Sequence, residues 1–359
     1  MRLAIQGLGV VGGFGQGVKA LHAALRQGTV AVQRCQVENS AGSDSFPAYR
    51  AATEGLEQFF PKRALRRIDH FSKMTLLSAC LALKDAGQLD ADRSRTGVVI
   101  ATGYGAIKTT FDFLDSYLDF GYSCSSPTHF SNSVHNAAAA HVSMQFKATA
   151  PSLTVTQFEM SVPSALLTAQ LWLAEGRVDQ VLFGTIDEYC DVLHYCRGQF
   201  FADGEQGPLQ PFNFSRQSAV IGEGAAFFVL TRATEPAAYA CIDSVRLGNH
   251  LAAPLELPQG DRLIVGADGH KECGRWYQQV LKGRQAAAYA PLYGSFPAAA
   301  GFDLAVAALS IRDRTLYASP EQSGLALTEE SMSQQLDDAQ LACLKFGPGG
   351  DYGLIRLSA

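Results

Sequence analysis

The sequence contains no uninterrupted apolar run long enough for a membrane-spanning helix. Its one long uncharged stretch, between Arg284 and Asp303, is broken by Pro291, Pro297 and several glycines, whereas a span needs about 20 mainly apolar residues in one continuous helix. The first residues, MRLAIQGLGVVG, also lack the apolar segment and cleavage site of a signal peptide. We therefore expect a cytoplasmic protein with no membrane span.

Paired cysteine motifs are missing as well. The eight cysteines are scattered, with no C-x-x-C spacing and no paired Cys/His pattern, which argues against a disulfide framework and against a zinc site. An excess of positive charge is also lacking, because 29 Lys and Arg stand against 34 Asp and Glu for a net charge of −5. The electrostatic field of a protein with this net negative charge repels the phosphate backbone of a nucleic acid. We expect no metal, no cofactor and no nucleic-acid partner.

The 359 residues are 47% hydrophobic, which supplies a large core. Short apolar, β-branched runs alternate with alanine-rich amphipathic runs, a pattern that favours an α/β fold. The first series predicts strands at 3–6, 98–102, 153–156, 180–185 and 225–231 and helices at 18–24, 72–85, 136–144 and 163–174. A second, shorter series predicts strands at 240–247, 263–265, 343–346 and 353–357 and helices at 271–281 and 302–312. We expect two successive halves, residues 1–238 and 239–359.

One glycine motif suggests a nucleotide site. Gly7-Leu-Gly9-Val-Val-Gly12 matches the G-x-G-x-x-G fingerprint directly after the first predicted strand. That fingerprint needs a helix opening at its third glycine, and the further glycines at 13, 15 and 17 disfavour one. Glu38 lies farther on than the expected ~20 residues, behind a segment with little strand character. We favour a glycine-rich turn between strand and helix, with an NAD(P)-dependent dehydrogenase as the alternative.

Seven segments, in order along nearly the whole chain, resemble the β-ketoacyl-acyl-carrier-protein synthases. They are IQGLGVV at the start, RRIDHFSKMTLLSACLALKDAG at 66–87, VVIATGYG at 98–105, SPTHFSNSVHNAAAAHVSM at 126–144, AEGRVDQVLFGTIDE at 174–188, PLQPFN with RQSAVIGEGAAFFVL at 208–230, and FGPGGDYGLIRL at the end. The resemblance implies a thiolase-like fold of two pseudo-duplicated halves in five αβαβα layers. The chain departs from the family at one point: the stretch from Gly248 to Val265 is too short for a helix that the family usually has there.

The resemblance implies a condensing site whose reactive groups this chain lacks. Such an enzyme uses a cysteine at a helix N-terminus, where the dipole and backbone N–H groups lower the thiol pKa. Counting back from the family-like turn at 176–179, the nucleophile position falls on Glu159, with Gln157 as the other register. The position of the first histidine holds Asp268, and His270, two residues on, is expected to face another direction.

Three further groups of the family's site are also replaced. The position of the second histidine holds Ser295, and that of the supporting lysine falls on Ala290 or its neighbour. The C-terminal glycine-rich loop reads Gly347-Pro348-Gly349-Gly350, and proline has no N–H to donate to an oxyanion. A donor of this kind is typically worth ~2.7–4 kcal/mol in acyl-transfer enzymes.

Other candidate residues concern partners. The resemblance places a helical aromatic segment and the residues after it at the dimer interface, where they border the acyl channel of the neighbouring subunit. Their spacing fits ordinary core aromatics equally well. The residues concerned are Phe113, Tyr117, Phe120, His129 and Phe130. The strand from Leu153 to Thr156 is expected to pair across a pseudo-twofold axis. A basic cluster fits contact with a carrier protein or partner subunit, although we slightly favour a solvated helix face. The cluster comprises Lys62, Arg63, Arg66 and Arg67.

Together these features predict a catalytically degenerate family member that resembles a chain length factor of a type II polyketide or aryl polyene ketosynthase heterodimer. Its expected partners are an active ketosynthase subunit and an acyl carrier protein, and its expected role is to shape the acyl channel during polyketide or fatty-acid-type elongation. The first alternative is an active decarboxylase or acyltransferase that uses Glu159. The more remote alternative is the dehydrogenase, through Gly7, Gly9 and Gly12.

Overall fold

The computed structural model describes residues 1–39, 42–200, 207–234, 236–258, 260–284, 286–320, 334–336 and 340–359. Its main sheet comprises β1 (Leu3–Gly12), β2 (Gly15–Gln16), β5 (Thr96–Thr102), β6 (Ser152–Thr156), β7 (Gln180–Asp187), β8 (Gly224–Arg232), β9 (Cys241–Asn249), β10 (Leu263–Val265), β11 (Ala286–Ala287), β14 (Gln340–Phe346) and β15 (Asp351–Ser358). The helices are α1 (Gly17–Gln27), α2 (Lys62–Leu65), α3 (His70–Asp85), α4 (Ile107–Phe120), α5 (Pro127–Ser133), α6 (Ala137–Phe146), α7 (Ser161–Ala174), α8 (Asp191–Phe200), α9 (Lys271–Val280) and α10 (Ala300–Arg312).

The strands of the main sheet follow the order β11-β10-β14-β15-β9-β1-β8-β7-β5-β6, with β2 beside β1. Only two residue pairs, Leu3 with Ile242 and Ala4 with Cys241, join β1 to β9, so the sheet consists of two half-sheets. The strands of one half-sheet come from residues 3–232 and those of the other from residues 241–358. The proposed domain division at residue 238 stays a prediction.

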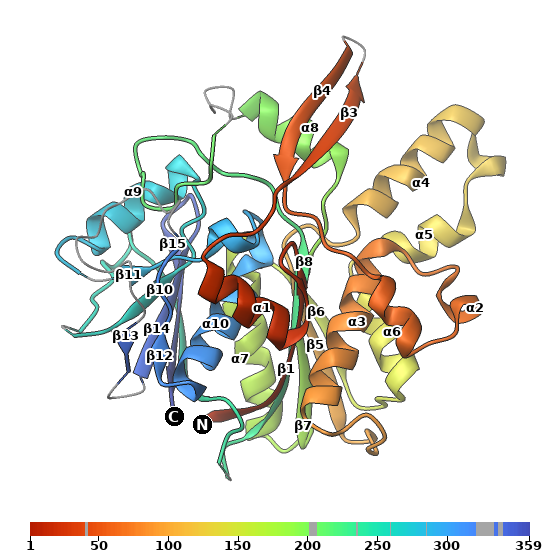
Figure 1. The fold of residues 1–359 in the computed structure, drawn as a ribbon. Coiled ribbons are helices and arrows are strands. Elements are labelled where there is room, and N and C mark those ends of the chain that lie inside the picture. The colour runs from red at the N-terminus through yellow and green to blue at the C-terminus, as the bar shows by residue number, and fades with distance from the viewer. Residues whose placement is uncertain are drawn as a thin grey trace.

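The helices complete five layers (Figure 1). Helices α3 and α6 pack on the outer face of the half-sheet that ends in β6, and α9 packs on the outer face of the other half-sheet. Helices α7 and α10 contact strands of both half-sheets and therefore form the middle layer. Three large clusters of buried side chains lie between these layers. The mixed α/β fold and its layering are those that the sequence predicts.

The middle layer explains one sequence feature. Helix α10 (AGFDLAVAALSIR) is apolar around nearly its whole circumference, as a helix covered on all sides must be. Its carboxylate, Asp303, is buried and accepts a hydrogen bond from the Tyr293 hydroxyl. Burial raises the pKa of Asp303 to about 6, and the bond from Tyr293 opposes that rise.

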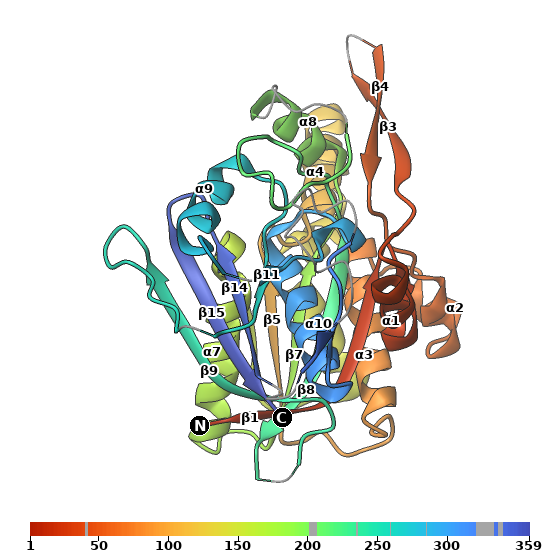
Figure 2. The same cartoon turned by 60° about the vertical axis from the view of Figure 1, so that its left-hand side comes forward.

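The strands and helices predicted from the sequence all coincide with elements of the structure. The prediction of little strand character for the segment before Glu38, however, is wrong. It forms β3 (Gln33–Asn39), which pairs antiparallel with β4 (Gly42–Ala48) and projects from the body beside α8 (Figures 1 and 2). Its alternating Cys35 and Val37 pack on a small cluster around Phe46, so the strand is half-buried despite its polar sequence.

The glycine motif lies inside β1, and its predicted position in a turn is wrong. Gly7 and Gly9 pair with β8, where a Cβ on Gly9 would lie 2.1 Å from the carbonyl oxygen of Ser78 in α3. Gly12 ends the strand, and β2 rather than a helix follows it. These glycines therefore allow close packing of α3 on β1, and the dehydrogenase alternative loses the motif on which it depended.

Among the described residues, no helix combines the length and apolar character required to cross a membrane.

Candidate functional site

A cavity of about 400 Å³ lies beside the ends of β7, β10 and β14, and both halves of the chain contribute to its lining. The four positions at which the resemblance predicts lost catalytic groups all line it: Glu159, Asp268, Ser295 and Pro348. The structure therefore brings together residues that are up to 189 positions apart in the sequence.

Glu159 lies in a 3-10 turn, Phe158–Met160, that leads directly into α7. Gln157, the other candidate register, is exposed, and its side-chain oxygen accepts a 2.6 Å hydrogen bond from the Ser164 hydroxyl. Burial raises the pKa of the Glu159 carboxyl, and the positive charge of Lys345 opposes that rise. Of the two candidates, Glu159 is the one that faces the cavity.

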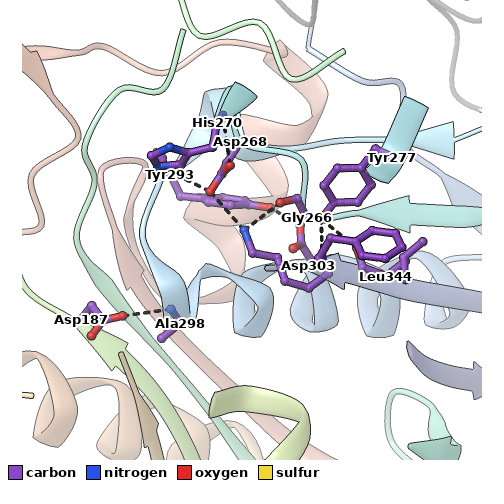
Figure 3. A network of polar contacts seen from close by, with 12 residues as sticks. Asp187, Gly266, Asp268, His270, Tyr277, Tyr293, Ala298, Asp303 and Leu344 are labelled. Atoms are coloured by element: carbon purple, nitrogen blue, oxygen red, sulfur yellow. Dashed lines mark hydrogen bonds and ion pairs between the residues drawn. The ribbon is translucent and has the colours of Figure 1, made fainter. Parts of the chain in front are cut away.

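A buried ion pair occupies the position that the resemblance assigns to the first histidine (Figure 3). Lys345 Nζ lies 3.1 Å from Asp268 Oδ2, and the two side chains are 4% and 7% exposed. Nζ also donates to Gly266 O at 2.8 Å, and the Ser295 hydroxyl donates to Asp268 Oδ2 at 3.0 Å. Burial favours a higher pKa for Asp268 and a lower one for Lys345, but their mutual attraction prevails: the pKa of Asp268 is below its usual range and that of Lys345 above it.

Lys345 is a site residue that the sequence does not predict. The resemblance places the family's supporting lysine at Ala290 or its neighbour, and Ala290 is a buried, uncharged residue of the 3-10 turn Ala290–Leu292. Lys345 instead stands in β14, in the otherwise apolar run LACLKF. A single lysine within a buried strand was the available signal, because a buried ammonium requires a partner of opposite charge.

His270 also lines the cavity, so the expectation that it faces elsewhere is wrong. That expectation assumed an extended backbone, whereas Gly269 has a φ of +84° and turns the chain. The ring atom Nε2 accepts a 2.8 Å hydrogen bond from Nη2 of Arg197. Burial lowers the pKa of His270 to about 4; Asp268 opposes this shift and Arg197 adds to it. The imidazole is therefore neutral at neutral pH.

Arg197 enters the cavity from α8, a helix that the sequence analysis did not predict. Its Nη1 donates to the Ser295 carbonyl oxygen and its Nη2 to the Ser295 hydroxyl, both at 3.1 Å. Desolvation lowers the pKa of Arg197, and the nearby Tyr104, Asp268 and Glu159 oppose that change. The guanidinium therefore covers the position that the resemblance assigns to the second histidine. Only the packing of α8 brings it there, so no local sequence signal identifies it.

The loop between β14 and β15 lacks the expected oxyanion donor. Pro348 lines the cavity, and its carbonyl oxygen accepts hydrogen bonds from Trp276 Nε1 at 3.0 Å and Arg275 Nη2 at 2.9 Å. Because proline carries no N–H, this position offers an acceptor where acyl transfer requires a donor.

The cavity contains one thiol, that of Cys273 in α9. Burial raises its pKa well above the usual value, and Asp268 adds to that rise. A thiol with a raised pKa is a weak nucleophile, because the thiolate is the reactive form. No group of three or more His, Cys, Asp or Glu residues in the described ranges is arranged to hold a metal ion.

Asp187 holds the cavity wall together. Its carboxylate, which is fully buried at the end of β7, accepts hydrogen bonds of 2.8–3.0 Å from the Thr102 hydroxyl and from the backbone N–H groups of Gly103, Tyr104 and Ala298. Figure 3 shows the bond from Ala298. Burial raises the pKa of Asp187 to about 6, and these four bonds oppose the rise. One side chain thus connects three segments that surround the cavity.

Comparison with known proteins agrees with this geometry. Residues 1–236 match the family model described as Beta-ketoacyl synthase, N-terminal domain. The chain belongs to the β-ketoacyl synthase family. It is 26% identical over 291 residues, 72% of this chain, to 3-oxoacyl-[acyl-carrier-protein] synthase 2 of Rhizobium meliloti (strain 1021) and covers 68% of that protein. Two further curated synthases match over 58% and 57% of their own length.

Solved ketosynthase structures share the fold over the whole chain. The ishigamide ketosynthase/chain length factor superposes with a TM-score of 0.80 at 17% identity and covers 100% of this chain and 99% of that one. A ketosynthase (ApeO) in complex with its chain length factor (ApeC) from Xenorhabdus doucetiae gives a TM-score of 0.79 at 16% identity and covers 99% and 98%. The predicted β-ketoacyl synthase family and the predicted fold are therefore confirmed.

The residues predicted to contact a partner lie outside the cavity of this ketosynthase-family chain. Phe113 packs on Phe130 with ring centroids 5.4 Å apart, and His129 is partly buried beside them. Tyr117 and Phe120, on α4, are 49% and 68% exposed, and Phe130, on α5, is 59% exposed. Helices α4 and α5 pack on each other, and we call residues 107–133 the α4–α5 projection. The aromatic residues lie on this projection and are not members of the central core.

Two other predicted groups are on the surface. Leu153 and Thr156 are exposed residues of β6, the last strand of the main sheet. The basic cluster is also exposed, and Lys62 pairs with Glu57 at 3.2 Å; its members are Lys62, Arg63, Arg66 and Arg67. Their predicted contacts with a partner or carrier protein stay predictions.

Proposed function

We propose that this chain is a non-catalytic, chain-length-factor-like subunit that pairs with an active β-ketoacyl-acyl-carrier-protein synthase and shapes its acyl channel. The observation that carries the proposal is the composition of the cavity. Where a condensing enzyme needs a thiolate, two imidazoles and an oxyanion donor, the cavity presents Glu159, Asp268, Ser295 and Pro348. Condensation requires an acyl-thioester on the enzyme, and none of these four groups can form one.

The ion pair supports the same conclusion. An imidazole that assists decarboxylation must be able to exchange a hydrogen bond with the substrate, whereas Asp268 is already bound to Lys345 and Ser295. His270, the one imidazole that lines the cavity, accepts from Arg197 and is neutral at neutral pH. Asp268 and His270 therefore have partners within the protein, which leave these two side chains unavailable for acid–base catalysis.

The surface supports the proposed pairing. Within the described ranges, strand β6 pairs with β5 on one side only, and its sequence, SLTVT, contains no charge or proline that would protect a sheet edge. Sixteen large apolar side chains of the described residues are exposed, and ten of them lie between residues 114 and 158. A stretch of chain that is rich in exposed apolar side chains and contains a sheet edge is typical of an interface with another subunit.

The α4–α5 projection is the proposed device that shapes the partner's channel. Phe113 packs on Phe130 and holds the two helices together. The exposed rings of Tyr117, Phe120 and Phe130 would then be available to limit the space for a growing chain in the partner subunit. Product length would thus be a steric outcome, without chemistry in this subunit.

We assign the basic cluster at 62–67 to contact with an acidic carrier protein. Its four cationic side chains are exposed in a chain whose net charge is −5. Such a cluster raises the encounter rate with an acidic partner more than the final affinity.

A second candidate function is favoured by one observation. Burial raises the pKa of Glu159 in a cavity that also holds Asp268, and a carboxyl group with a raised pKa suits general acid catalysis. This arrangement keeps open an active decarboxylase or acyltransferase that uses Glu159.

Reconstitution separates the two candidates. The purified chain is incubated with malonyl- and acyl-carrier proteins, alone and with each ketosynthase of its source genome that carries a Cys-His-His set. We expect no decarboxylation or condensation by the chain alone and condensation when the partner is present. Turnover by the isolated chain that disappears in Glu159→Ala, but persists in Glu272→Ala, would instead establish the active enzyme. Glu272 is a suitable control because it lines the same cavity and its side chain is 61% exposed.

A further inference from the structure

One exposed aromatic residue stands between the unpaired sheet edge and the cavity. Phe158 follows the end of β6 by two residues, and its side chain is 59% exposed. The next residue, Glu159, faces the cavity. The short turn that contains both residues therefore presents one side chain to each surface.

The backbone at Phe158 is strained. Its φ is +45°, in the left-handed region that costs a non-glycine residue roughly 1–2 kcal/mol. Ser161, which is fully buried, holds the turn: its hydroxyl oxygen accepts a 2.7 Å hydrogen bond from the Gln157 N–H and lies 2.7 Å from the Phe158 carbonyl oxygen. Backbone strain that a buried serine holds in place at an exposed residue indicates a function for that residue's position.

The ring of Phe158 is oriented before any partner binds. It packs edge to face on Tyr104, with centroids 6.0 Å apart and an angle of 70° between the planes. A ring held in one orientation loses little conformational entropy when it is buried in an interface. Large aromatic side chains of this kind are typical centres of binding energy.

We propose that Phe158 is an anchor that the ketosynthase partner buries when its own edge strand pairs with β6. The proposal deepens the proposed function and rests on it. Antiparallel pairing centred on Thr154 places residue 158 roughly 13 Å from the centre, at ~3.3 Å per residue. The ring then lies beyond the end of the paired strands, against the segment that precedes the partner's edge strand.

The occupant is a different subunit rather than a second copy of this chain. Helix α4 exposes Asp115 and Asp119 beside the apolar Leu114 and Leu118, and it packs on α5, which in turn packs on α6 beside β6. Within the part of the chain that the structure describes, neither aspartate has an ion-pair partner. Charge complementarity therefore favours a partner that presents basic residues to α4, which a second copy of the same acidic helix does not.

Phe158→Asn tests the anchor, because asparagine tolerates the left-handed backbone and lacks the ring. Each ketosynthase of the source genome is co-expressed with the wild-type chain to identify the partner, and the dissociation constant is then measured for the variants. We expect Phe158→Asn to weaken the heterodimer by roughly 30-fold, the size of a hot-spot truncation. Tyr195→Asn, an aromatic of similar exposure on α8, is the matched control and should change the affinity by less than about 3-fold.

Two further measurements separate the outcomes. The melting temperature of the isolated Phe158→Asn chain should stay close to that of the wild type, because relief of the backbone strain offsets the lost contact with Tyr104. A clear fall would mean that Phe158 serves the fold and would refute the proposal. A photo-crosslinking p-benzoylphenylalanine at position 158 should attach to the ketosynthase subunit, and attachment to a second copy would refute the assigned occupant. If the wild-type chain binds no ketosynthase, the proposed function fails; if it binds one and Phe158→Asn binds equally well, only the anchor fails.

Discussion

The ion pair between Lys345 and Asp268 gives the sharpest test of how this cavity is built. The two side chains are 4% and 7% exposed, so solvent screens them little. Removing one member of such a pair leaves a buried, uncompensated charge, which costs about 3–5 kcal/mol. Lys345→Met keeps the volume of the side chain and removes the charge. We expect it to lower the melting temperature by about 6–10 °C, at roughly 2 °C per kcal/mol for a protein of this size.

A double-mutant cycle isolates the pair. Asp268→Asn should be as destabilising as Lys345→Met, because it leaves the ammonium without a counter-charge. The double variant should recover most of the loss and retain a deficit of about 1–3 kcal/mol, since the Gly266 carbonyl oxygen loses its hydrogen bond from Lys345. Differential scanning fluorimetry at neutral pH measures all four proteins. Additive losses in the double variant would refute the assignment of a coupled pair.

The pH dependence follows from the directions of the two pKa shifts. The pKa of Asp268 is depressed, so its contribution is present above the unfolded value of about 4 and is lost as the pH falls through the folded value. The pKa of Lys345 is raised, so its contribution is present below about 10.4 and is lost as the pH rises through the folded value. The pair should therefore contribute constant stability to the wild type from about pH 5 to 9. In Lys345→Met, burial without a counter-charge raises the pKa of Asp268, so the variant should recover stability by protonation and the difference between the two proteins should shrink as the pH falls. A difference that grew as the pH fell within that window would contradict the pairing.

Two other features of the chain give direct predictions. Gly9→Ala should destabilise the fold by at least about 1–3 kcal/mol, because its Cβ would lie 2.1 Å from the Ser78 carbonyl oxygen. Gly349→Ala is the control: its Cβ would meet nothing nearer than 3.4 Å, so the melting temperature should change little. Equal melting temperatures of the two variants would contradict the packing argument. Cys273 should react with iodoacetamide far more slowly than the partly exposed Cys196, since burial raises the Cys273 pKa. An acyl-thioester found by mass spectrometry on Cys273 of the isolated chain would overturn the non-catalytic proposal.

The hydrophobic pattern predicts the elements that build the layers. A strand such as β5, buried on both faces, and a helix such as α10, apolar all round, leave little freedom in their assignment. The pattern failed for β3, whose polar residues alternate with Cys35 and Val37, because only the small cluster around Phe46 makes that strand half-buried. Elements that depend on a few tertiary contacts carry weak local signals.

The candidate site was predictable only in part, for a similar reason. The family resemblance identifies Glu159, Asp268 and Pro348 through their place in sequence segments, and the structure brings them to one cavity. It gives no information on Arg197, which reaches the cavity through the packing of α8, nor on the turn at Gly269 that directs His270 inward. Contacts of this kind become visible only when distant segments are placed side by side.

The replacement of one catalytic group makes others necessary. A carboxylate at the position of Asp268, buried without a partner, would cost several kcal/mol or take up a proton. Lys345, which reaches it from the neighbouring strand β14, supplies the compensating charge, and the Ser295 hydroxyl donates a further hydrogen bond. The cavity is therefore a polar core with its own internal balance of charge. A cysteine introduced at position 159 would meet an ion pair, a neutral imidazole and a proline, so a single substitution does not rebuild a condensing site.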